Sequence, residues 1–139
     1  MQGNTAMSYE VTITPEENYL HVVVTGSSSY ENAVDLWKTI AAESNKHNCF
    51  NILGEQSLDN PMPTMDAWNH QDIFLEVGIT AKFLLAWVDH NPRTFEHTEF
   101  IRKVLSNRDI GYGKLFSNVV EAKAWLQKKI ASKNTSLTS

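Results

Sequence analysis

The chain has 139 residues, of which 42% are apolar and 20% are charged, and its formal net charge is −4. These values predict one globular domain and argue against nucleic acid or an anionic membrane as the main partner. Cys49 is the single cysteine, so an internal disulfide is excluded, and the longest apolar run, residues 83–88, is too short to span a membrane. The sequence also has no secretory signal, and it therefore predicts a cytoplasmic protein.

The chain is predicted to begin with a β-hairpin. Tyr9, Val11 and Ile13 alternate with polar residues, as in a half-buried strand. Residues 15–18 have turn chemistry, and residues 20–25 are mostly β-branched and apolar. The exposed edge of this hairpin could pair across a two-fold axis, so we expect a homodimer, with a monomer as the alternative.

A first helix is expected to follow the hairpin. Ser28 and Glu31 have the spacing of a capping box, which satisfies free backbone N–H groups at a helix start. Apolar residues then recur at helical spacing, and the helix should end near residues 45–48.

A short strand is predicted at residues 50–53, followed by a polar loop. Thr64 can cap a second helix, which Gly78 is expected to stop. The predicted inner face of this helix comprises Ala67, Trp68, Gln71, Phe74 and Leu75.

The second half of the chain repeats the alternation of strand and helix. Residues 83–88 have no polar alternation, which is typical of a strand covered on both faces in a parallel sheet. Asn91-Pro92 predicts a helix start, residues 114–116 a last strand, and Asn118 with Glu121 another cap.

The resulting order β-β-α-β-α-β-α-β-α predicts an α/β fold with a mainly parallel mixed sheet flanked by helices. We expect an N-terminal extension at residues 1–8, a single domain at residues 9–131 and a disordered tail at residues 132–139, which has few large apolar residues.

The C-terminal part of the chain resembles small bacterial proteins with the SpoIIAA-like fold, which is shared by STAS domains. The residues that carry the resemblance are Lys114-Leu115-Phe116, then Asn118 to Glu121, and then Ala122 and Ala124-Trp125-Leu126. The resemblance covers roughly residues 8–130, and the predicted element order agrees with it.

The resemblance implies a non-enzymatic regulatory or protein-interaction module, similar to the anti-sigma-factor antagonists. In those proteins a phosphorylated Ser or Thr, preceded by Asp and followed by Gly, starts the helix after the third strand. This chain lacks that signature and offers Ser57 and Thr64 as candidate phosphorylation sites. A neutral helix cap remains the alternative for Thr64.

The residues expected to form a partner or ligand surface lie at the predicted carboxyl-terminal edge of the sheet, where open α/β folds bind ligands. They are Glu55, Ser57, Thr64, Asp66, Trp68 and His90.

The alternative function is a carrier or sensor of a small apolar or lipid-like ligand. The fold is similar to that of lipid-exchange domains, and the chain is rich in aromatic residues, including Trp68 and Phe74 of the second helix. An apolar space between this helix and the sheet would hold such a ligand; a packed core is the other interpretation.

No catalytic motif is present, so the sequence predicts neither an enzyme nor a cofactor. Glu55, Asp59 and Asp66 do not match a known metal loop, so no metal is expected. His90 and His97 are the candidates for contact with a ligand, and they would supply an imidazole if the protein were an enzyme after all. His97 falls on an apolar helical stripe, so a core-edge role is the alternative there.

Overall fold

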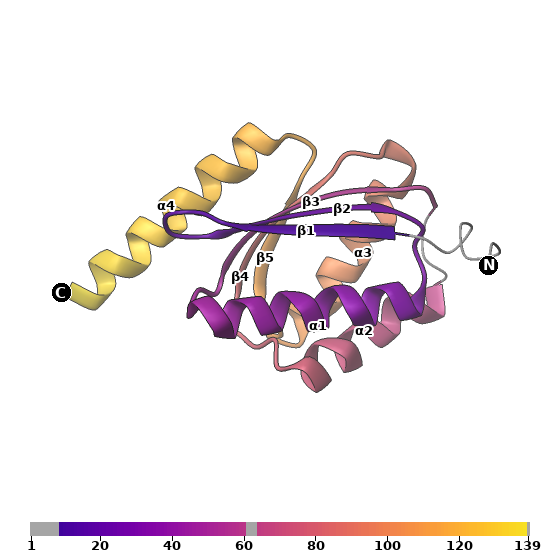
Figure 1. Ribbon diagram of the computed structural model, residues 1–139, viewed down its shortest axis with the longest axis horizontal. Coiled ribbons are helices and arrows are strands. Elements are labelled where there is room, and N and C mark those ends of the chain that lie inside the picture. The colour runs from indigo at the N-terminus through magenta and orange to yellow at the C-terminus, as the bar shows by residue number, and fades with distance from the viewer. Residues whose placement is uncertain (1–8, 61–63, 139) are drawn as a thin grey trace.

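The computed structural model describes residues 9–60 and 64–138, with the side chains of residues 9–60 and 69–133 (Figure 1). The predicted extension at residues 1–8 lies outside this part. The elements are β1 (Tyr9–Pro15), β2 (Leu20–Gly26), α1 (Tyr30–His47), β3 (Asn51–Leu58), α2 (Thr64–Val77), β4 (Leu84–Asp89), α3 (Pro92–Asn107), β5 (Tyr112–Phe116) and α4 (Val119–Thr138).

The five strands form one sheet in the order β1-β2-β3-β4-β5. β1 pairs with β2 in antiparallel fashion, and every later pair is parallel. This arrangement confirms the predicted single α/β unit with a mainly parallel mixed sheet. Within the described residues, no helix is both long and apolar enough to cross a membrane.

The helices cover the two faces of the sheet unequally (Figure 1). Parallel strands that follow one another in the same direction place their connecting helices on one face, because the crossovers share a hand. α1, α2 and α3 accordingly share a core with the sheet, which includes Trp37, Phe74 and Leu105. α4 packs on the opposite face through Ala122, Leu126 and Ile130.

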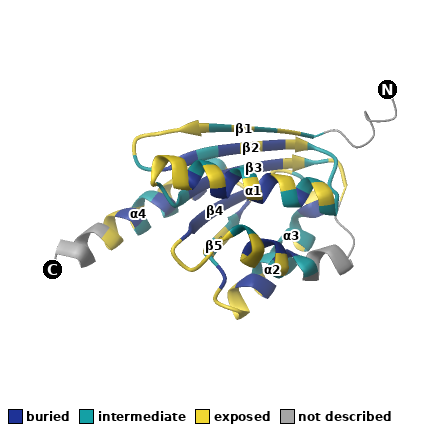
Figure 2. Ribbon diagram, turned by 60° about the horizontal axis from the view of Figure 1, so that its bottom comes forward, coloured by how far each residue is buried: buried dark blue, intermediate teal, exposed yellow. Residues whose placement is uncertain are grey.

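β4 lies at the centre of both cores and is buried at every position, as its uninterrupted apolar sequence predicts (Figure 2). Alternate residues of a strand point to opposite faces. Leu85 and Trp87 therefore meet α1–α3, whereas Leu84, Ala86 and Val88 meet α4.

Three predicted boundaries need correction. β3 extends to Leu58 rather than ending at residue 53, because its polar residues pair in register with β2 and β4. The cap of α1 is Ser29, whose hydroxyl accepts from the Asn32 N–H. α4 remains helical to Thr138 where a disordered tail was predicted from residue 132, since that segment has no proline or glycine to stop it.

The inner face of α2 also differs from the prediction. Ile73 and Phe74 are buried, and so is His70, whereas Leu75 is 62% exposed. A helix with few polar residues on one side can present more than one apolar stripe, and contact with α1 and α3 decides which stripe is buried. Thr64 is the first residue of α2 rather than a residue preceding it, and its side chain lies outside the described set.

Candidate ligand-binding site

A cavity of about 120 Å³ lies between the sheet and the layer formed by α1, α2 and α3. Its walls are mainly apolar, and it extends past Ser28 and Leu58 to Asn60, which is exposed, so that it opens at the carboxyl-terminal ends of β2 and β3. The large apolar side chains around it that are also buried are Leu36, Trp37, Phe74, Leu85, Trp87 and Leu105.

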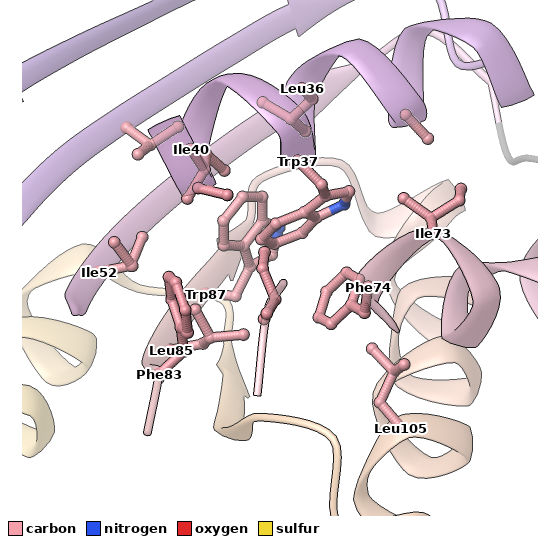
Figure 3. Close-up of a cluster of buried hydrophobic side chains, with 14 of the residues drawn as sticks. Leu36, Trp37, Ile40, Ile52, Ile73, Phe74, Phe83, Leu85, Trp87 and Leu105 are labelled. Atoms are coloured by element: carbon pink, nitrogen blue, oxygen red, sulfur yellow. The ribbon is translucent and has the colours of Figure 1, made fainter. Parts of the chain in front are cut away.

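Three aromatic rings form a continuous wall of the cavity. The ring centroids of Trp37 and Phe74 are 4.5 Å apart, and those of Trp37 and Trp87 are 5.0 Å apart. Figure 3 shows Trp37 reaching from α1 into the space between the sheet and α2, next to Phe74. The wall thus combines residues of α1, α2 and β4, which meet only in the folded chain.

The orientation of Trp87 is fixed from two sides. Gly54 is its neighbour in the sheet, and a Cβ atom there would overlap carbon atoms of the Trp87 ring. The indole N–H of Trp87 donates to Oε1 of Gln56 over 2.7 Å. Glycine therefore lets the ring lie against β3, and the buried amide sets its rotation.

Gln56 is held in turn by a buried polar network around Asp89. Nε2 of Gln56 donates to Oδ2 of Asp89 (3.1 Å) and to Oγ1 of Thr98 (3.0 Å). Asp89, which is 2% exposed, also accepts from the hydroxyls of Thr94 and Thr98 and from the Asn91 N–H. Asp89 is buried and already accepts hydrogen bonds from several donors, so it holds Gln56, and through it Trp87, in place at the wall of the cavity.

Two histidines line the same cavity. His70 of α2 is buried, and His97 of α3 is half-buried. Nε2 of His97 is fully buried and has no hydrogen-bond partner. Such an atom has lost water without replacing its hydrogen bond, which is rare in native proteins.

A second cluster of titratable residues lies on the opposite face of the sheet. Glu55 accepts hydrogen bonds from Nε2 of His21 (2.5 Å) and Nε2 of His90 (2.8 Å). Burial favours the neutral form of Glu55, but the hydrogen bonds to His90 and His21 outweigh it and lower the pKa of Glu55. The carboxylate is therefore ionised and engaged by both imidazoles.

No protein-family model matches this chain, and no curated protein matches it either. Among solved structures, it is similar to an uncharacterized DUF3478-family protein with a SpoIIAA-like fold from Shewanella loihica PV-4. Their identity is 18%, the TM-score is 0.53, and the match covers 85% of this chain and 93% of the other. The chain has a SpoIIAA-like fold.

The same SpoIIAA-like architecture is found in an anti-sigma factor antagonist from Mycobacterium paratuberculosis. That match has a TM-score of 0.58 at 12% identity and covers 86% of this chain and 95% of the other. The resemblance suggested by the C-terminal residues is thus confirmed at the level of the fold.

The structure brings together only some of the residues that were predicted to form a partner surface. Glu55 and His90 come together, and Ser57 is exposed two residues farther along β3, all on the sheet face that carries α4. The side chains of Thr64, Asp66 and Trp68 lie outside the described residues. The described part of the predicted surface, which comprises Glu55, Ser57 and His90, therefore lies on the sheet face away from the cavity. We had expected it to be continuous with the second helix.

The two histidines proposed for ligand contact also separate. His90 is exposed and bonded to Glu55, whereas His97 lines the cavity. Glu55 and Asp59 belong to no group of three or more ligating side chains that would hold a metal ion, within the part of the chain whose side chains are described.

Sequence reasoning missed Gln56 and His70 as parts of the site. Gln56 was assigned to a loop because β3 was predicted to end too early, and His70 was not among the histidines expected to contact a ligand. A usable signal was present in Gly54, because a glycine inside a strand often marks the close approach of another group.

Proposed function

We propose that this SpoIIAA-like protein binds a small, largely apolar molecule in the cavity between the sheet and α1–α3, as a carrier or sensor. The observation that carries the proposal is the aromatic wall of Trp37, Phe74 and Trp87 around unfilled space. Protein interiors are normally packed to crystal-like density, so a braced wall around a gap favours occupancy by a ligand.

The size of the cavity limits the ligand. An engineered protein cavity of roughly 150 Å³ with apolar walls binds benzene, whereas sites for drug-sized molecules start at roughly 300 Å³. The cavity here is about 120 Å³. The buried part of the ligand is therefore about the size of one six-membered ring or a short branched chain, and any remainder would project through the opening near Asn60.

Native mass spectrometry of the protein, purified from cell extracts and then mixed with toluene or indole, tests the proposal. We expect a bound small molecule on the wild-type protein. Ala33→Leu extends a side chain from α1 into the cavity and should abolish the bound mass, whereas Ala124→Leu makes the same change on an exposed position of α4. Unliganded wild-type protein under all these conditions would overturn the proposal.

A second candidate function is that of a protein-interaction module, supported by the fold shared with the anti-sigma factor antagonist. The candidate surface is the open part of the α4 face with Glu55, Ser57 and His90, and β1 as an edge strand offers a route to a homodimer. Affinity capture from the native host with wild-type protein and Ser57→Asp would test it. A captured partner that Ser57→Asp releases supports a phosphorylation-sensitive surface, and the absence of any protein partner counts against this function.

A further inference from the structure

We infer that the molecule bound in the cavity carries a hydroxyl or carboxyl oxygen that hydrogen-bonds to Nε2 of His97. The inference rests on the proposed binding function and specifies the ligand's chemistry. His97 differs from the other polar groups of α3 that line the cavity, because its Nε2 has no hydrogen-bond partner.

The polar groups near His97 on α3 are already engaged. Thr94 and Thr98 donate to Asp89, and Arg102 forms two 2.8 Å hydrogen bonds with Glu99. Among the described side chains, only Ser44 Oγ and His97 Nε2 are buried without a partner, and Ser44 does not line the cavity. His97 Nε2 is therefore the one described orphan atom on a residue that lines the cavity, and a turn of the imidazole toward the cavity would bring it to a ligand.

The position of His97 on its helix brings it to the cavity. Residues of α3 that line the cavity recur at three- and four-residue spacing, which places them on one face of the helix. They are Thr94, His97, Thr98, Ile101, Arg102 and Leu105. A ligand ring packed against Ile101 and Leu105 would lie within a helical turn or two of the imidazole.

The charged side chains that line the cavity determine which polar group the ligand can carry. Among the described residues, the cavity is lined by two basic side chains, Arg102 and Lys114, and by no carboxylate. An ammonium group would be buried there without a counter-charge, which is unfavourable. A hydroxyl or protonated carboxyl group both donates and accepts, so it satisfies either tautomer of a neutral imidazole.

Phenol and toluene form a matched pair of probes, because they have nearly the same size and differ in the oxygen. Binding is followed by the indole N–H resonances in two-dimensional NMR, with Trp37 and Trp87 as reporters in the cavity. Trp125 packs against Phe116 on the α4 side and serves as the internal control. The quantity of interest is the ratio of the two dissociation constants, toluene over phenol.

We expect this ratio to fall about five- to tenfold in His97→Leu, which removes the hydrogen bond but keeps an apolar side chain of similar size. His97→Gln retains donor and acceptor groups and should restore part of the ratio. Ser44→Ala removes the other orphan atom and should leave the ratio unchanged.

Two results would overturn the inference in distinguishable ways. If both probes shift the Trp37 and Trp87 signals but the ratio is the same in wild-type protein and His97→Leu, the cavity binds ligands without using His97. If neither probe shifts these signals, the proposed binding function fails together with the inference.

Discussion

The two faces of the sheet are built from the same strands but packed differently. On the α4 face, Leu53, Ala86 and Val88 meet Ala122 and Leu126, and all five are at most 2% exposed. Small side chains at the contact let one helix approach closely and close the core. This face shows what complete packing looks like in the molecule.

The opposite face places Gly54, Gln56 and Trp87 on the same two central strands. Three helices, α1, α2 and α3, cover this face. The aromatic side chains between these helices and the sheet do not fill the space completely, and the cavity is what remains. Alternate residues of one strand point to opposite faces of the sheet. A register shift of one residue would therefore move the side chains of the packed face to the cavity face, and the reverse. The comparison indicates that the gap belongs to one face and is not a general looseness of the fold.

The largest expected effect is a difference between two leucine truncations. Leu126→Ala on the packed face should lower the free energy of unfolding by about 4 kcal/mol, whereas Leu105→Ala beside the cavity should cost about 2 kcal/mol, because a side chain that borders a gap makes fewer contacts. Urea denaturation of both variants measures the difference. Equal losses would mean that the two faces are equally well packed.

Gly54→Ala should have an intermediate effect. The added methyl group overlaps the Trp87 ring, so either the ring or β3 must move, at a cost of about 1–3 kcal/mol. The indole signal of Trp87 should shift in NMR spectra. Gly78→Ala is the comparison variant: its Cβ meets open space, and its cost comes from the positive φ of 90° alone. An unchanged Trp87 signal in Gly54→Ala would show that the glycine does not position the ring.

The smallest expected effect concerns the open part of the α4 face. The lowered pKa of Glu55 means that the folded state binds fewer protons there than the unfolded state. Its contribution to stability is therefore present above about pH 4.5, the ordinary value, and is lost as the pH falls through the lowered pKa.

Glu55→Gln should accordingly reduce stability by at most about 1 kcal/mol at pH 7 and by almost nothing near pH 3. Thermal unfolding at the two pH values tests this, with Glu17→Gln in the exposed β1–β2 turn as the control. A loss of equal size at both pH values would show that the ionised carboxylate is not what stabilises the cluster.

Much of the fold was predictable because its signals are local. The uninterrupted apolar run of β4 and the alternation in β1 each specify an element without knowledge of distant contacts. β3 was predicted less well: its polar second half is held by pairing with β2 and β4, which no window of residues 54–58 reveals.

The site was less predictable than the fold for a geometric reason. Glu55 and Gln56 are adjacent in sequence but belong to opposite faces, and the predicted surface included Glu55 but not Gln56. His97 was identified as an unusual member of an apolar stripe. Whether it meets a filled or an open core depends on how α1, α2 and α3 pack together, which the sequence of α3 does not contain.

The most direct test of the central claim is a crystal structure of the protein under xenon pressure, because apolar protein cavities take up xenon. We expect a xenon atom in the cavity beside Phe74 and Trp87 in wild-type protein, and its loss in Ala33→Leu with the fold unchanged. A structure in which neighbouring side chains fill this space and no xenon is bound there would contradict the account.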